Sequence, residues 1–181
     1  MKQTLYILRL VMTLLAITAL VAAALAGVNA ITADRIAADK AEKTRQAIEK
    51  VLSGATDFAE TAFEDETGLV KTVYRSSAGY AVEVAPAGFG GAITMMVGIS
   101  NEGKVLGLQV ISHTETPGLG AVAGGKGAAG QSFRDSFVGL FGSVAVSKDG
   151  GEADTITGAT ITSRAVAEGV NAALACVAKF S

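Results

Sequence analysis

The stretch Tyr80-Ala81-Val82-Glu83-Val84 decides the fold class of this chain of 181 residues, because large apolar side chains recur at every second position along it. A period of two is typical of a β-strand that packs one face against a core. Residues 69–75, 79–84, 93–99 and 104–111 are short β-rich runs bounded by Gly, Ser or Asn. Between the last two, Asn101-Glu102-Gly103-Lys104 has the composition of a hairpin turn. The sequence therefore predicts an antiparallel meander.

Helical patterns lie on both sides of these strands. Residues 34–52 mix charged side chains with alanine and larger aliphatic residues, and residues 57–66 form a shorter acidic segment; we expect a helix in each. After the strands we expect a helix near residues 131–141, a short strand at 144–147 and a last helix from 163 to 180, whose apolar residues recur at helical spacing. Strands clustered between helices predict an α+β fold, an antiparallel sheet flanked by helices.

The N-terminal segment is different in kind, because no charged residue occurs between positions 10 and 33. About 20 apolar residues are enough for a helix to cross a bilayer. Lys2 and Arg9 precede the segment, and the positive-inside rule then leaves the N-terminus in the cytoplasm and the rest of the chain outside. A cleaved signal peptide, cut near Val28-Asn29-Ala30, is the alternative, but the apolar stretch is long for one.

These boundaries predict a single-pass protein of the cell inner (cytoplasmic) membrane with four parts. Residues 1–9 are cytoplasmic, residues 10–33 form a transmembrane anchor, residues 34–66 form a helical stalk region and residues 67–181 form the α+β domain on the extracytoplasmic side. The mean hydropathy of +0.43 is then an average over one apolar span and one soluble domain.

Composition excludes several function classes. The chain has 15 Lys and Arg against 17 Asp and Glu, so it lacks the basic excess with which proteins bind nucleic acid. One Cys excludes an internal disulfide framework and a multi-cysteine iron–sulfur site, and one His excludes a histidine-rich metal site. We expect no nucleic-acid partner and no metal site.

The segment Asp154-Thr155-Ile156-Thr157-Gly158-Ala159-Thr160-Ile161-Thr162-Ser163 places five hydroxyl residues directly before the last helix. Thr162 or Ser163 is a natural N-cap there. The free N–H groups of a first helical turn and the helix dipole favour a negative group, and Gly158 and Ala159 leave room for a phosphate to approach the backbone. Two interpretations stay open: a phosphate or anion site, or a turn that only caps the helix.

Two motifs carry a family resemblance. Asp154-x-x-Thr157-Gly158-Ala159-Thr160 resembles the flavinylation motif D-x-x-[ST]-G-A-T of FMN-binding domains, in which the last Thr bears FMN through a phosphoester. About 40 residues earlier, His113-Thr114-Glu115-Thr116-Pro117-Gly118-Leu119-Gly120 resembles the segment of that family that lines the flavin. The whole chain is most similar to the G subunit of Rnf-type ion-translocating ferredoxin:NAD⁺ oxidoreductases. The C subunit of Na⁺-translocating NADH:quinone reductases is a longer relative.

The resemblance implies an electron-transfer subunit that is not catalytic alone and carries covalent FMN on Thr160, which makes it a flavoprotein and, through the phosphoester, a phosphoprotein. Further contacts to the cofactor are then expected from both motifs, namely from Glu115, Thr116, Pro117, Gly118, Leu119, Thr157, Gly158, Ala159, Ile161 and Thr162. In the family a separate flavin transferase, which uses FAD and Mg²⁺, recognises the motif, here Asp154, Thr157, Gly158, Ala159 and Thr160. The expected partners are this transferase and the other membrane subunits of the complex.

Three further residues are interpreted from their type and position. His113, the only histidine, follows a strand and is expected to form structural hydrogen bonds rather than to catalyse. Cys176 is expected to be a buried, inert thiol, and Phe89 is expected in the core rather than against a flavin. One alternative to covalent FMN stays open, a membrane-anchored extracytoplasmic module that binds a phosphate-containing ligand noncovalently.

Overall fold

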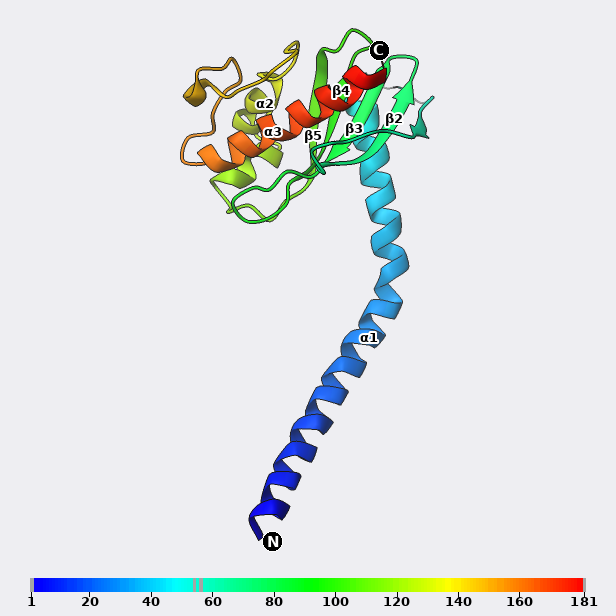
Figure 1. The fold of residues 1–181 in the computed structure, drawn as a ribbon, viewed down its shortest axis with the longest axis vertical. Coiled ribbons are helices and arrows are strands. Elements are labelled where there is room, and N and C mark those ends of the chain that lie inside the picture. The colour runs from blue at the N-terminus through cyan, green and yellow to red at the C-terminus, as the bar shows by residue number, and fades with distance from the viewer. Residues whose placement is uncertain (1, 54, 56, 181) are drawn as a thin grey trace. The chain divides into compact units, whose positions relative to one another are not determined.

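The computed structural model describes residues 2–53, 55 and 57–180. The chain divides into two compact units between Glu42 and Lys43, and each is described by itself. Helix α1 (Lys2–Val51) contributes its longer part to the first unit and its last turns to the second, which also contains the sheet and the remaining helices (Figure 1).

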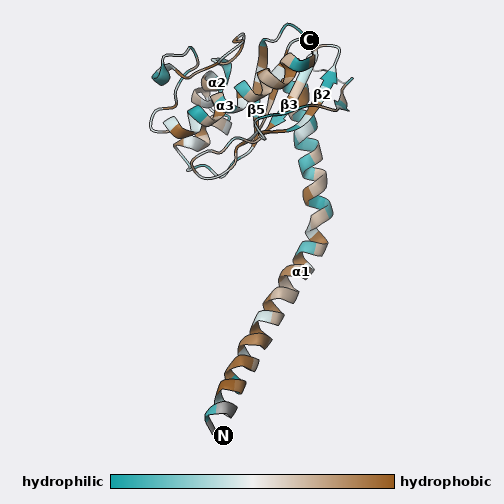
Figure 2. Cartoon of the chain, in the orientation of Figure 1, coloured by the Kyte–Doolittle hydropathy of each residue, from teal (hydrophilic) through white to brown (hydrophobic). Residues whose placement is uncertain are grey.

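The first unit is one helix, which is apolar over residues 10–33 and charged beyond them. Every side chain described from Tyr6 to Ile31 is exposed, and the helix is long and apolar enough to cross a membrane. Figure 2 shows the hydrophobic colour concentrated in the N-terminal half of α1. The hydroxyls of Thr13 and Thr18 donate to the carbonyls of Arg9 and Leu14, so these polar groups are satisfied within the helix, as a bilayer requires.

The second unit is built on a five-stranded antiparallel sheet. Its strands are β1 (Ala59–Thr61), β2 (Val70–Ser76), β3 (Gly79–Val84), β4 (Thr94–Ile99) and β5 (Val105–Ser112), and they pair in sequence order. The α+β class and the meander are confirmed. The acidic helix expected at residues 57–66 is wrong, because this segment lacks an apolar helical face and instead pairs its backbone with β2 as an edge strand.

Both faces of the sheet are covered. Helix α3 (Thr160–Val177) packs on the face that carries Val82 and Val97. The last turns of α1 pack on the other face, where Ile48 and Leu52 contact the layer that contains Met96. Every residue of β3 is therefore buried, not only the alternate ones, and the end of the expected stalk region belongs to the domain core.

Gly158 and Ser163 decide how the C-terminal segment begins its helix. Gly158 has a φ of +77° and turns the chain, and α3 starts at Thr160, three residues before the expected position. Ala159 occupies the N-cap position, so the expected capping by Thr162 or Ser163 is wrong. The Ser163 hydroxyl instead accepts from the Ile156 N–H and donates to the Ala159 carbonyl, which fastens the turn from inside the domain.

Residues 113–159, between β5 and α3, contain short helices rather than long ones. These are the 3₁₀ helix η1 (Gly120–Gly124), helix α2 (Ala128–Asp135) and the 3₁₀ helix η2 (Ser147–Asp149), and α3 is followed by η3 (Ala178–Phe180). Helix α2 lies earlier than the expected residues 131–141. The strand expected at 144–147 does not form, since only Val146 makes a bridge, to Ala153, before η2 begins.

Candidate functional site

The two motifs, far apart in the sequence, meet at one cavity of about 360 Å³. This volume is within the range of about 300–1,000 Å³ that is usual for small-molecule sites. The cavity is lined by Phe89, Glu115, Thr116, Leu119, Gly120, Lys148, Gly158, Ala159, Thr160, Ile161 and Thr162. The fold thus brings the loop after β5 to the N-terminus of α3.

Some motif residues lie beside the cavity rather than in its wall. Pro117 and Gly118 form an exposed turn, in which Gly118 has a φ of +76° and the flanking Thr116 and Leu119 line the cavity. Asp154 and Thr157 are also exposed, and the Asp154 backbone N–H donates to the Ser136 hydroxyl at 2.9 Å. These exposed side chains are accessible to another protein.

Glu115 joins the two motifs in the wall of the cavity. Its side chain is 6% exposed, and its Oε1 accepts from the Gly90 N–H at 2.7 Å. Its Oε2 accepts from the Thr162 hydroxyl, which is itself buried. A Cβ at Gly120 would collide with both side chains, so the absence of a side chain at that position makes room for the pair.

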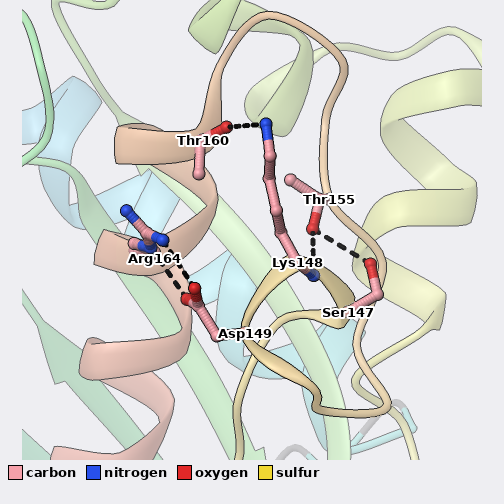
Figure 3. Close-up of polar contacts among 6 residues, drawn as sticks. All are labelled: Ser147, Lys148, Asp149, Thr155, Thr160 and Arg164. Carbon is pink, nitrogen blue, oxygen red and sulfur yellow. Dashed lines mark hydrogen bonds and ion pairs between the residues drawn. The ribbon is translucent and has the colours of Figure 1, made fainter.

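Thr160 lines the same cavity from the start of α3. As the first residue of α3 it lies where backbone N–H groups have no partner within the helix and the helix dipole favours an anion. The Lys148 Nζ donates to the Thr160 Oγ1 at 3.3 Å, and Figure 3 shows the lysine extending from η2 toward the threonine. A hydroxyl, a cation and free N–H groups therefore meet at one point.

Comparison with known proteins agrees with this geometry. Residues 88–175 match the FMN-binding domain. The chain is 31% identical to the G subunit of the ion-translocating oxidoreductase complex of Methanosarcina acetivorans, and the match covers 96% of each protein. It is 35% identical to the G subunit of the Na(+)-translocating ferredoxin:NAD(+) oxidoreductase complex of Acetobacterium woodii, over 90% of this chain and 87% of that protein.

The chain belongs to the G-subunit family of these complexes. The match to the corresponding protein of Stutzerimonas stutzeri, at 36% identity over 91% of this chain and 78% of that protein, extends the same result. The FMN-binding domain contains every residue that lines the cavity, since Phe89 and Thr162 are the outermost of them.

The cavity of this G-subunit family member also contains two residues that the sequence motifs did not indicate. Phe89, expected in the core, is 70% exposed and lies at the cavity, because the Glu115 carboxylate and the Thr114 hydroxyl hold Gly90 in a loop that turns away from the sheet. In the sequence, the position of Phe89 between Gly88 and Gly90 was the feature that could have indicated an exposed loop. Lys148 has no such signal, because its distance from Thr160 is short only in the folded chain.

His113 and Cys176 do not line the cavity. The His113 Nδ1 accepts from the Glu115 backbone N–H at 3.2 Å, a structural hydrogen bond that orients the loop after β5. Cys176 is buried in α3, and desolvation raises the pKa of its thiol. Both residues therefore support the fold around the site rather than contact a ligand in it.

The chemistry of the lining residues suits FMN. Phe89, Leu119 and Ile161 are large apolar side chains that remain partly exposed at the cavity, as suits a ring system that lies against them. Lys148 and the start of α3, which line the same cavity, suit a phosphate.

Proposed function

We propose that this chain is an electron-transfer subunit of a membrane-bound, ion-translocating Rnf-type complex and carries FMN through a phosphoester to Thr160. One observation carries the proposal: the Thr160 hydroxyl lies in the wall of the same cavity that Glu115, Thr116 and Leu119 line from the other motif. When bound, FMN supplies transfer of single electrons. A covalent link retains the cofactor outside the cytoplasm, where free FMN would diffuse away.

Each part of the site then has a task. Phe89, Leu119 and Ile161 bind the apolar part of the flavin and exclude water from it. Glu115 holds Gly90 and Thr162 in place, so that the loop and the helix keep a constant separation. The diester has one negative charge, which suits the N-terminus of α3.

Attachment requires a flavin transferase with FAD as the donor. The Thr160 Oγ1 forms a bond to the phosphorus of the flavin phosphate, the P–O bond to the adenylate breaks, AMP leaves, and the hydroxyl proton is released. Asp154 and Thr157 are exposed, and Thr160 lies in the wall of the adjacent cavity, so the transferase can reach the motif in the folded domain.

The topology proposed for the membrane follows from α1. Residues 10–33 cross the cell inner membrane, residues 1–9 remain in the cytoplasm with Arg9, and the FMN-binding domain is extracytoplasmic. Protease added to spheroplasts should digest the domain. Digestion only after lysis would contradict this orientation.

The covalent link is tested by co-expression with a flavin transferase and intact mass measurement. We expect one mass increase equal to FMN less one water, and flavin fluorescence that stays with the polypeptide on a denaturing gel. Thr160→Ala should abolish both, and Thr157→Ser, which the motif permits, should keep both. Flavin that leaves on denaturation would favour the noncovalent phosphate-binding module, and an adduct that persists in Thr160→Ala would exclude Thr160 as the attachment point.

A further inference from the structure

Lys148 is a charged cavity residue outside both motifs. It lies in η2, is exposed, and donates from its Nζ to the Thr160 Oγ1 at 3.3 Å (Figure 3). A neutral hydroxyl is a weak partner for an ammonium group, which binds phosphate well as a compact charge. The contact therefore places a cation at the atom that the proposed function esterifies.

The carboxylate next to Lys148 is already engaged. Asp149 accepts from the Arg164 Nε at 2.7 Å and from its Nη2 at 2.5 Å, and this hydrogen-bonded pair lowers the pKa of Asp149. Among residues 2–53, 55 and 57–180, the ion pairs found do not include Lys148. Its charge is thus left available to a group bound at Thr160.

The backbone of Lys148 is held from two sides. Its N–H donates to the Thr155 Oγ1 at 3.3 Å, and the Ser147 hydroxyl contacts the same oxygen at 3.0 Å. The ion pair between Asp149 and Arg164 connects η2 to the first turns of α3 (Figure 3). The lysine therefore extends from a segment that is tied both to the flavinylation motif and to the helix that begins at Thr160.

We propose that Lys148 binds the phosphate of the flavin attached to Thr160, an inference that rests on the proposed function. The helix N-terminus supplies the equivalent of only about half a positive charge, and the full charge of Lys148 complements the single negative charge of the diester. Lys148 is a positioning residue in this role, because it holds the attachment arm and does not contact the ring that exchanges electrons.

The first test compares the amine reactivity of the full chain in detergent before and after flavinylation, by limited acetylation and peptide mass analysis. We expect acetylation of Lys148 to fall by about threefold to fivefold on flavinylation, the scale of an exposed ion pair. Lys126 is the matched control, since it is exposed in the same domain and does not line the cavity, and its reactivity should stay constant. Unchanged reactivity of Lys148 in a chain that carries the adduct overturns the inference but not the proposed function. Absence of the adduct in the wild type overturns the proposed function itself.

The second test separates phosphate binding from simple shielding by the flavin. The ³¹P resonance of the flavinylated chain should shift in Lys148→Gln, stay near its wild-type position in Lys148→Arg, which keeps the charge, and be unchanged in Lys126→Gln. An unshifted resonance in Lys148→Gln overturns the inference. Equal loss of flavinylation in the Gln and Arg variants also overturns it, because the charge would then not be the property that matters.

Discussion

The buried hydrogen bond from the Thr162 hydroxyl to the Glu115 carboxylate gives a quantitative prediction. Thr162 is 1% exposed and Glu115 is 6% exposed, so water does not replace a lost donor. Valine has nearly the shape of threonine but lacks the hydroxyl. Thr162→Val therefore removes one hydrogen bond to the carboxylate and leaves the one from the Gly90 N–H.

A hydrogen bond to a charged group contributes about 1.5–3 kcal/mol net, and we expect Thr162→Val to lower the free energy of unfolding by this amount. For a domain of this size, each kcal/mol shifts Tm by roughly 3–4 °C, so Tm should fall by roughly 5–12 °C.

The assay is thermal unfolding of the full chain in detergent, followed by near-ultraviolet circular dichroism, which reports on the aromatic side chains of the domain rather than on the helical content of α1. Thr157→Val is the control, because Thr157 is exposed and its substitution should change Tm little. Equal Tm values for the two variants would refute the reasoning, since Glu115 would then be stable without the Thr162 donor.

Other predictions concern residues away from the flavin. Cys176 should resist thiol reagents at pH 8 in the folded chain, because burial raises the pKa of its thiol. It should react fully in denaturant, and rapid reaction of the native chain would contradict the burial. Gly169→Ala should lower the free energy of unfolding by about 1–3 kcal/mol, because the new Cβ would lie 2.9 Å from the Pro86 Cγ. Urea unfolding measures this change, and a stabilised variant would show that helix propensity outweighs the crowding. The hydrogen bond with Arg164 lowers the pKa of Asp149 in the folded chain below its ordinary value of 3.8. The pair therefore stabilises the fold at pH values above 3.8, and this stabilisation is lost as the pH falls through the lowered pKa of the folded chain. Carbon NMR of the carboxyl should show a midpoint below 3.8 that rises in Arg164→Gln, and an unmoved midpoint would argue against the pair.

The fold was predictable where the pattern is local. Strand β3 was identified from its alternation at residues 79–84, and the apolar span from its lack of charge. Edge strand β1 was not, because three residues that pair only through their backbone have no side-chain pattern. The burial of Ile48 was also hidden, since only the packing of α1 on the sheet distinguishes it from a residue of a solvated stalk.

The candidate site was likewise predictable from the sequence only in part. The motif residues around Thr160 and Glu115 were identified from types and spacing, and the structure brings both to one cavity. Phe89 was placed wrongly, because its exposure depends on hydrogen bonds from residues about 25 positions away. The start of α3 was placed too late, because hydroxyl-rich residues suit an N-cap by composition while the positive φ of Gly158 sets the actual turn.

The sequence by itself determined that the chain combines one apolar span with an α+β domain, and it determined the family through two motifs, because periodicity, charge and residue type are local properties. Only the tertiary structure decided that Lys148 meets Thr160, that Glu115 joins two distant segments and that the end of α1 covers one face of the sheet. These contacts join residues that are separated in sequence, and their geometry depends on how the sheet and helices pack.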